Sequence, residues 1–143
     1  MEIKVGEKKT AEQVFDLLSY FDDSSDTPLH EGLDFKSYSL KLSKFAYFIL
    51  AYDNSNLVGF IAYYLNEKNK IVYVPQVVVH KFGRHKGIGH AMFTSLEKAN
   101  KGLFSHIELE VLKENKNARL FYEREGFVFK DDHGNRLLLF KSI

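Results

Sequence analysis

Hydrophobic residues recur along this 143-residue chain in two kinds of pattern, one typical of helices and one typical of buried strands. Residues 2–5 predict a short opening strand. Thr10 and Gln13 then fit a capping box, in which a threonine and a glutamine close the first turn of a helix. The helix that follows is expected to bury one face, made of Val14, Leu17, Leu18 and Phe21.

A second amphipathic stretch follows an acidic, turn-rich segment that runs from Asp22 to Asp34. Its apolar residues also lie at helical spacing. They are Phe35, Tyr38, Leu42 and Phe45. We therefore expect two successive helices between the opening strand and the rest of the chain.

Three apolar runs come next, at 45–52, 57–65 and 71–79. The segments between them are short and polar enough for hairpin turns. The runs are nearly continuous in apolar residues, whereas a strand with one solvated face alternates. They therefore predict adjacent strands in a sheet that is covered on both faces.

The second half of the chain alternates helices and strands. A helix is expected from Gly87 to about Asn100, with a buried stripe of Ile88, Ala91, Met92, Leu96 and Ala99. A strand at 107–112 precedes a helix that begins near Asn115 or Asn117 and ends at Gly126, a residue type common at helix C-termini. Two strands, 127–130 and 136–141, then form a hairpin whose turn contains Gly134.

The order of these elements predicts an α/β fold of the α+β type. We expect a mixed, mostly antiparallel central sheet of about seven strands with helices on both faces. Hydrophobic residues make up 45% of the chain and charged residues 27%, an ordinary globular composition. The length suits one core, so residues 1–143 are expected to form a single domain.

Charge and cysteine content narrow the class of protein. Twenty Lys and Arg against nineteen Asp and Glu leave a net charge of +1, which disfavours nucleic acid and membrane surfaces as partners. Cysteine is absent, which excludes disulfides, thiolate metal sites and cysteine nucleophiles. The chain lacks an apolar run of ~20 residues, and residues 1–9 lack the apolar core of a signal peptide. A cytoplasmic location is therefore expected.

A basic, glycine-containing loop joins the strand at 71–79 to the next helix. Gly87 and Gly89 allow a ligand close to the backbone, and the first N–H groups of the helix have no internal partners. The helix dipole and the basic residues Lys81, Arg84 and Lys86 add positive charge. The segment suits a diphosphate, although a plain connection with solvated basic residues is an alternative. A Walker A loop is excluded because His90 follows Gly89, and a dinucleotide fingerprint fits poorly.

The pattern Arg84-x-x-Gly87-x-Gly89 resembles the acyl-CoA-binding motif of the GNAT N-acyltransferase superfamily, [QR]-x-x-G-x-[GA]. A second run resembles the other half of the family signature: Leu109-Glu110-Val111-x-x-x-Asn115-x-x-Ala118-x-x-x-Tyr122-x-x-x-Gly126-Phe127. The two motifs lie on successive helices separated by one strand, as in the family. The resemblance covers roughly residues 57–129, and it implies a GNAT-like fold and an acyl-CoA-dependent N-acyltransferase.

The resemblance also implies roles for individual residues. Backbone N–H groups of Arg84, His85, Lys86, Gly87, Ile88 and Gly89 would bind the CoA pyrophosphate. Main-chain groups of Val77, Val78 and Val79 would pair with pantetheine like an added strand. Asn115 would contact the pantetheine arm or cap its helix. Tyr122 would lie near the CoA sulfur and protonate the leaving thiolate, although packing beneath the next strand is the other interpretation of this ring.

The base that deprotonates the acceptor is left open. Many members of the family carry a carboxylate where this chain has Gln76, and an amide cannot take a proton. Five acids and no Lys or Arg occur between residues 22 and 35, which suggests a cationic amine acceptor. The acids are Asp22, Asp23, Asp26, Glu31 and Asp34. Glu31 and Asp34 are the candidate catalytic or orienting groups, and the alternative is a solvated acidic loop.

His30, Glu108 and Glu110 are further candidates for the base. The histidines lack the spacing of a metal site, so no metal is predicted. The predicted function is transfer of an acetyl group from acetyl-CoA to a primary amine of a small molecule or peptide. Direct attack in a ternary complex agrees with the absence of cysteine. A non-catalytic acyl-CoA sensor is the alternative, nucleic-acid binding through residues 80–90 is disfavoured, and a homodimer is left open.

Overall fold

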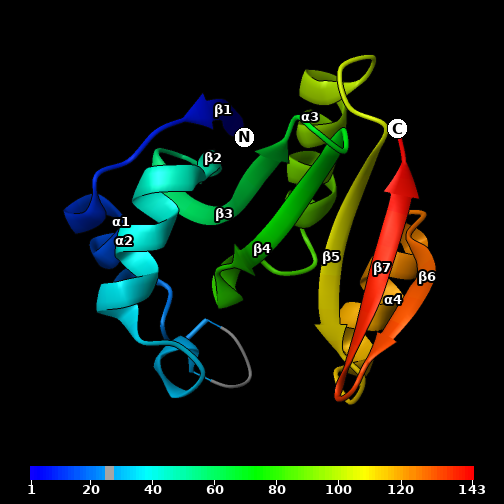
Figure 1. Cartoon of the computed structure of the whole chain (residues 1–143). Coiled ribbons are helices and arrows are strands. Elements are labelled where there is room, and N and C mark those ends of the chain that lie inside the picture. The colour runs from blue at the N-terminus through cyan, green and yellow to red at the C-terminus, as the bar shows by residue number, and fades with distance from the viewer. Residues whose placement is uncertain (25–27) are drawn as a thin grey trace.

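The computed structural model describes residues 1–24 and 28–143, without the side chain of Phe82. Seven strands form one sheet in the order β1-β2-β3-β4-β5-β7-β6 (Figure 1). The strands are β1 (Glu2–Glu7), β2 (Tyr47–Asp53), β3 (Asn56–Asn66), β4 (Ile71–Val79), β5 (His106–Leu112), β6 (Val128–His133) and β7 (Arg136–Ser142). Neighbouring strands are antiparallel except β4 and β5, which are parallel. The predicted fold class is confirmed.

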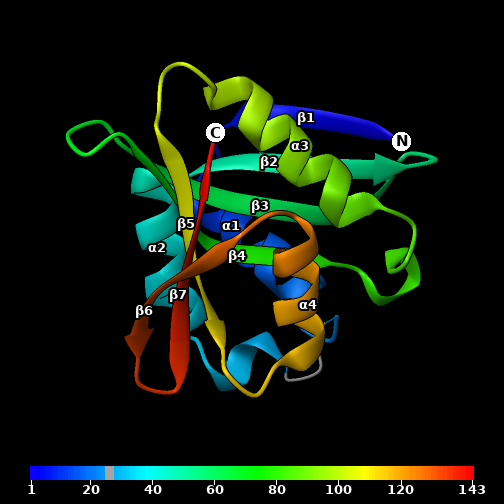
Figure 2. The same cartoon turned by 90° about the vertical axis from the view of Figure 1, so that its right-hand side faces the viewer.

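Four α-helices cover the two faces of the sheet. They are α1 (Ala11–Tyr20), α2 (Phe35–Phe45), α3 (Ile88–Asn100) and α4 (Lys116–Arg124), with two short 3-10 helices, η1 (Leu29–Glu31) and η2 (Lys81–Gly83). Helices α1 and α2 lie on one face, and α3 and α4 lie on the other (Figures 1 and 2). None of the helices in the described part of the chain is long and apolar enough to cross a membrane.

Each face of the sheet has its own hydrophobic core, which explains the continuous apolar runs. Along β2, Phe48 belongs to the core under α1 and α2, whereas Ile49 belongs to the core under α3. Both side chains are fully buried. Because successive residues of a strand point to opposite faces, a strand between two helical layers must be apolar at almost every position.

The first helix begins where its sequence predicts. The Thr10 hydroxyl accepts from the Gln13 N–H at 3.2 Å, and the Gln13 side chain accepts from the Thr10 N–H at 3.0 Å. The four apolar residues expected to be buried on this helix are all buried, including Phe21 at its C-cap. Local capping and helical periodicity therefore determine this element.

Three expectations of detail are wrong. Phe45 is the last residue of α2, and 62% of it is exposed. Ala99 is exposed, whereas the next residue, Asn100, is buried and its side-chain amide donates to the Leu96 carbonyl oxygen at 2.9 Å. Strand β6 continues to His133, so its hairpin turn is shorter than expected.

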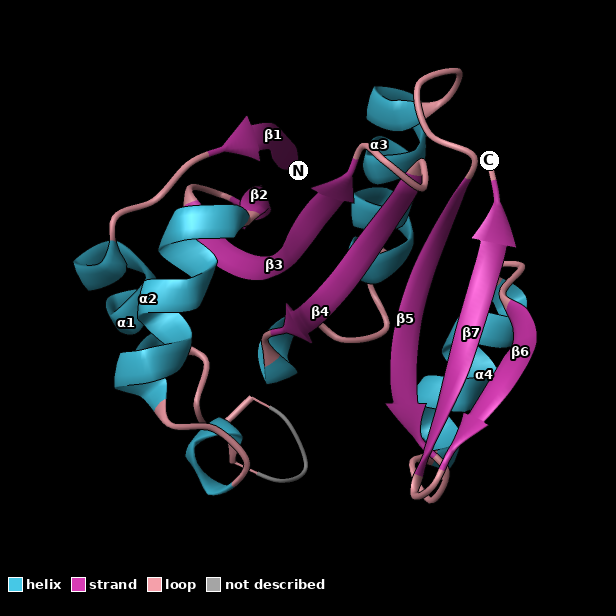
Figure 3. Ribbon diagram, viewed as in Figure 1, coloured by secondary structure: helices cyan, strands magenta, loops and turns pink. Residues whose placement is uncertain are grey.

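The sheet opens between its two parallel strands. Strands β4 and β5 pair only from Ile71 opposite His106 to Val74 opposite Leu109. Beyond this point they diverge (Figure 3). Pairing with β3 shows an extra residue in β4 between Tyr73 and Gln76, which is a β-bulge. The bulge contains Pro75, which has no N–H to donate, so β4 lacks the group that would extend the ladder there.

Gly59 on β3 offers a test of the packing beneath α3. A Cβ at this position would lie 3.0 Å from the Val78 carbonyl oxygen and 3.1 Å from the Met92 methyl carbon. We expect Gly59→Ala to lower the free energy of unfolding by roughly 1–3 kcal/mol, because the Val78 carbonyl oxygen belongs to the backbone of a paired strand and cannot move away from the added methyl group. Urea denaturation measures this value. Gly32→Ala is the control, since its Cβ meets nothing within 4 Å; equal losses in both variants would contradict the prediction.

Candidate active site

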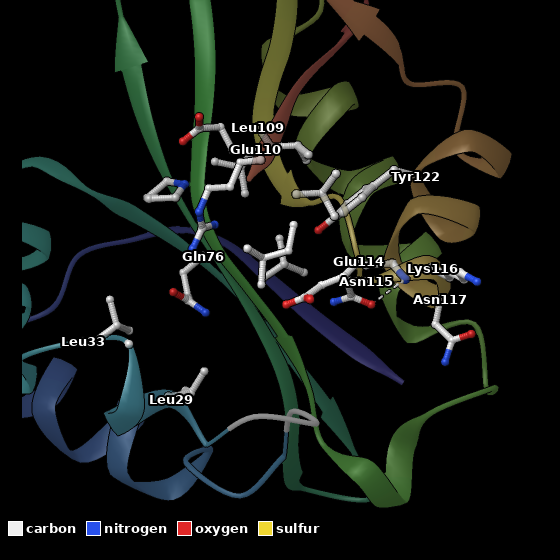
Figure 4. Close-up of a pocket in the computed structure, with 18 of the residues that line it drawn as sticks. Leu29, Leu33, Gln76, Leu109, Glu110, Glu114, Asn115, Lys116, Asn117 and Tyr122 are labelled. Carbon is white, nitrogen blue, oxygen red and sulfur yellow. Dashed lines mark hydrogen bonds between the residues drawn. The ribbon is translucent and has the colours of Figure 1, made fainter. Parts of the chain in front are cut away.

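A cavity of about 810 Å³ lies where β4 and β5 separate (Figure 4). It is lined by β4, β5, the first residues and one turn of α4, the segment around η1, and single residues of α2 and β7. The lining residues include Leu29, Leu33, Gln76, Val77, Glu110, Glu114, Asn115, Tyr122 and Arg136. Segments far apart in the sequence therefore face one another across the gap in the sheet.

The open edge of β4 presents main-chain groups to this gap. The His80 N–H donates to the Val58 carbonyl oxygen at 2.7 Å, so His80 points its backbone toward β3. Because backbone groups alternate between the two edges of a strand, Val78 also faces β3, whereas Val77 and Val79 face the side that β5 has left. Of the three valines expected to pair with a ligand, two therefore have backbone groups available at this edge.

The loop after β4 leads into the N-terminus of α3. Gly87 is the N-cap residue, with φ at +75°, in the left-handed region that favours glycine. It provides no side-chain cap for the first turn of the helix. Residues 84–87 are exposed. Helix α3 has 13 residues, and its first turn has no side-chain cap at Gly87. The N-terminal end of this helix lies beside a basic loop, an arrangement that suits an anion.

Gly89 has a role that the sequence alone does not reveal. A Cβ on Gly89 would lie 2.9 Å from the Phe121 ring of α4. One residue later, the His90 imidazole pairs with the Glu125 carboxylate at 2.9 Å. Glycine here permits close approach of α3 to α4, and this contact brings the N-terminal end of α3 beside the helix that carries Tyr122.

Tyr122 combines both interpretations of its sequence position. Its ring makes edge contacts with Phe93 and Phe127, with centroids 5.9 and 5.6 Å apart. Its hydroxyl points into the cavity (Figure 4). Burial raises the pKa of Tyr122 to about 12. The hydroxyl therefore stays protonated at neutral pH and can donate a proton to a strong base.

Asn115 is the N-cap of α4. Its side-chain oxygen accepts from the Ala118 N–H at 3.2 Å, shown as a dashed line in Figure 4. Of the two roles implied for Asn115, helix capping is present in the structure. The residue also lines the cavity, with its side-chain amide N–H groups as further donors.

The acceptor side of the cavity is less acidic than the sequence suggests. Asp34 caps α2 and accepts from the Ser37 hydroxyl at 2.7 Å, and Glu31 is exposed in η1. Neither belongs to the described lining of the cavity, to which this segment contributes Pro28, Leu29, Gly32 and Leu33. Asp22 pairs with His30 at 2.7 Å. Asp26 lies outside the described residues.

Two carboxylates from the other wall line the cavity instead, Glu110 on β5 and Glu114 just after it. Glu108, the other candidate on β5, is buried away from the described lining and held by His106 and Lys130, each at 3.0 Å. The Tyr38 hydroxyl donates to the Gln76 side-chain oxygen at 3.3 Å. Gln76 is thus a neutral, hydrogen-bonded part of the wall.

Sequence reasoning did not identify Glu114, Arg136, Leu29 or Leu33 as lining residues. Only Glu114 carried a usable signal, because it immediately precedes the predicted helix start. No group of three histidines, aspartates or glutamates within residues 1–24 and 28–143 is arranged to hold a metal ion.

The family comparison agrees with this geometry. The profile described as the Acetyltransferase (GNAT) family matches residues 12–127, which include both walls of the cavity and the uncapped helix. The chain belongs to the Acetyltransferase (GNAT) family. Its predicted membership and its predicted class of enzyme, an acetyltransferase, are confirmed. No curated protein matches the chain.

Solved structures of GNAT proteins share the fold. PaiA N-acetyltransferase from Thermoplasma acidophilum, in complex with coenzyme A, is 20% identical with a TM-score of 0.77, over 100% of both chains. Ribosomal-protein-S18-alanine N-acetyltransferase from Escherichia coli is 14% identical with a TM-score of 0.78, over 99% of this chain and 94% of that chain. An acetyltransferase from Bacillus anthracis in complex with acetyl coenzyme A is 24% identical with a TM-score of 0.60, over 69% and 62%.

Removing the cap of α4 tests the local structure of the site. Asn115→Ala should lower the free energy of unfolding by about 1 kcal/mol, because the first turn of the helix loses its side-chain acceptor. Asn117→Ala is the matched control, since Asn117 lies inside the helix, where alanine is favourable. Chemical denaturation of both variants measures the difference. A stability loss no greater for Asn115→Ala than for Asn117→Ala would show that the cap contributes nothing.

Proposed function

We propose that this GNAT protein transfers an acetyl group from acetyl-CoA to a primary amine by direct attack in a ternary complex. The observation that carries the proposal is the Tyr122 hydroxyl, protonated and directed into a cavity between diverging strands. The uncapped end of α3 lies beside the same helix. We extend the proposal to residues 1–143 acting as one cytoplasmic domain, without a nucleic-acid or membrane partner.

The donor would bind along the loop and the open edge of β4. The CoA pyrophosphate would accept hydrogen bonds from backbone N–H groups between Arg84 and Gly89, where the dipole of α3 favours negative charge. Pantetheine would pair with the edge of β4 at Val77 and Val79, as an added strand does. Two of the similar structures contain coenzyme A or acetyl coenzyme A, which supports this class of ligand.

The chemistry needs a polarised carbonyl and a protonated leaving group. An N–H on the open edge of β4, such as that of Val77, can donate to the thioester oxygen as negative charge develops there. The amine nitrogen forms the new bond to the acetyl carbon, and the carbon–sulfur bond breaks. The Tyr122 O–H then gives its proton to the CoA thiolate, and the proton that the attacking nitrogen loses as it becomes an amide returns to the Tyr122 oxygen through water. Tyrosine is suited to this step because its proton is retained until a base is generated.

The acceptor must lose a proton before it attacks. An amine with a lysine-like pKa is neutral about once in a thousand at neutral pH, which corresponds to roughly 4–5 kcal/mol. Gln76 cannot serve, and we assign the base to Glu110 because it is half-buried, whereas Glu114, the other carboxylate that lines the cavity, is exposed. Glu31 and Asp34 are proposed only to attract a cationic acceptor, and Leu29 and Leu33 favour an uncharged group next to its amine.

A non-catalytic acyl-CoA sensor is the second candidate, favoured by the amide at Gln76. Release of CoA from acetyl-CoA separates the two functions when it is followed across amino acids, polyamines, aminoglycosides and peptides with free N-termini. Turnover of one amine, with its acetylated product identified by mass, supports the transferase. Tight binding of acetyl-CoA without turnover across the panel supports the sensor.

Gly87→Val tests the pyrophosphate loop. The variant should lose the thermal stabilisation that CoA gives, because a branched side chain would occupy the open space at the helix end. Gly102→Val is the matched control, with φ at +84° and equally open surroundings. Both variants should lose stability by a similar ~1–2 kcal/mol from backbone strain. Retention of the CoA-induced shift by Gly87→Val would refute the assignment of this loop.

Tyr122→Phe tests the proton donor. The phenylalanine keeps the ring contacts and removes the hydroxyl, so kcat should fall about 10²–10⁴-fold while the Kd for acetyl-CoA stays within about twofold. Single-turnover kinetics isolate the chemical step. Tyr64→Phe is the control, because its hydroxyl is buried without a partner among the described residues and lies outside the described cavity lining. An unchanged rate of the chemical step in Tyr122→Phe would show that this residue contributes only to packing.

A further inference from the structure

A histidine contacts the carboxylate that lines the cavity. The Nδ1 atom of His133, the last residue of β6, lies 2.6 Å from a carboxylate oxygen of Glu110 on β5. Strand β7 lies between β5 and β6, and the register sets Glu110 opposite Leu138 and His133 opposite Arg136. The imidazole therefore reaches diagonally over β7. Two residues 23 positions apart form one hydrogen-bonded pair.

The pair has one end in the cavity and the other in solvent. Glu110 lines the cavity, and 29% of its side chain is exposed. The His133 side chain is 39% exposed. Three other histidines contact carboxylates in the described part of the chain, His30 at Asp22, His106 at Glu108 and His90 at Glu125. None of these three carboxylates is among the described lining of the cavity. Of the four carboxylates compared, only Glu110, through His133, connects the cavity to the surface.

Charged and titratable groups surround the pair on every packed strand. The Tyr73 hydroxyl of β4 donates to the second Glu110 oxygen at 3.4 Å. On β6, Asp131 lies 3.4 Å from the Nε2 atom of His133, and Asp132 is the next residue. Arg136 of β7 is the register partner of His133. The two carboxylates thus contact the two nitrogens of one imidazole.

We propose that His133 accepts the proton that Glu110 removes from the acceptor ammonium ion and delivers it to solvent. This inference rests on the proposed amine transferase function. The ammonium N–H bond breaks as an O–H bond forms on Glu110. That O–H bond then breaks as the Nδ1–H bond of His133 forms. The imidazolium then releases its Nε2 proton to water, which leaves a neutral imidazole with its proton on Nδ1. Proton exchange with water restores the Nε2–H form, and both side chains are then in their starting states.

The surroundings of His133 suit this transfer. When Glu110 holds the proton, a neutral imidazole with its Nε2–H directed at Asp131 turns its Nδ1 lone pair toward the Glu110 O–H. Once the proton has moved, the Nδ1–H donates to the Glu110 carboxylate, and this hydrogen bond, with added attraction from Glu110 and Asp131, raises the pKa of His133 above its usual value. Below that pKa the imidazolium already holds the proton and cannot accept another. Activity should therefore rise with pH through the pKa of His133.

The coupling between the two groups is measured without an acceptor. Histidine side-chain NMR signals, followed against pH with acetyl-CoA bound, should give a His133 pKa above the ordinary ~6.5. Glu110→Gln should lower that pKa and leave the pKa of His30, which the paired Asp22 raises, within experimental error. A His133 pKa that does not respond to Glu110→Gln overturns the proposal, whether or not the protein acetylates an amine.

The kinetic test uses the primary amine that the native protein acetylates fastest in the panel. His133→Gln should lower kcat/KM at least tenfold and shift the acidic limb of its pH profile to lower pH. The KM for acetyl-CoA should stay within twofold. His106→Gln is the control, because it removes an imidazole paired with a carboxylate that the described cavity lining does not include. Added imidazole should partly restore the kcat/KM of His133→Ala and leave the kcat/KM of the His106 variant unchanged.

The outcomes separate this inference from the function on which it depends. If His133→Gln keeps the native pH profile while the native protein turns over the amine, the transferase function stands and the proton path is wrong. If the native protein turns over no amine of the panel, the transferase function fails, and the proton path falls with it. The NMR titration still decides whether Glu110 controls the protonation of His133.

Discussion

The separation of β4 from β5 is the constraint on which the rest of the site depends. A parallel pair of strands normally satisfies its backbone groups by continuous hydrogen bonding, yet this pair ends at Val74 and Leu109. The bulge at Pro75 accounts for the end of the pairing, because proline removes a donor and the extra residue bends the strand. The cavity, the open edge at Val77 and the access to Glu110 all follow from this one interruption.

A second close approach joins the loop that we propose binds CoA to α4, the helix that carries Tyr122. Gly89 has no side chain, so the Phe121 ring packs against the start of α3, and the adjacent Tyr122 is held by Phe93 and Phe127. The ring is fixed by packing while its hydroxyl reaches the cavity. The aromatic cluster therefore holds the hydroxyl that we propose as the proton donor at a defined position.

Much of the donor half of the site was predictable from the sequence, and much of the acceptor half was not. Gly87 and Gly89 lie at the start of one helix, and Asn115 and Tyr122 lie on another, so helix geometry sets the positions within each pair. The packing of Gly89 against Phe121, which brings the two helices together, was not predictable. The acidic segment was counted as one feature, but Asp34 forms a helix cap and Asp22 pairs with His30. Net charge over a segment does not determine which side chains point into a cavity, because each carboxylate first satisfies the nearest backbone and side-chain donors.

The sequence by itself determined the order of the elements, the capped start of the first helix, the glycine-containing loop before α3 and the family. These features depend on periodicity, capping and glycine spacing, all of which act over a few residues. Only the tertiary structure decided where β4 leaves β5, which carboxylates line the cavity and that His133 meets Glu110. Those contacts join residues from separate strands, and β7 must insert between β5 and β6 before they form. A linear pattern carries no information on such distances until the register of the sheet is known.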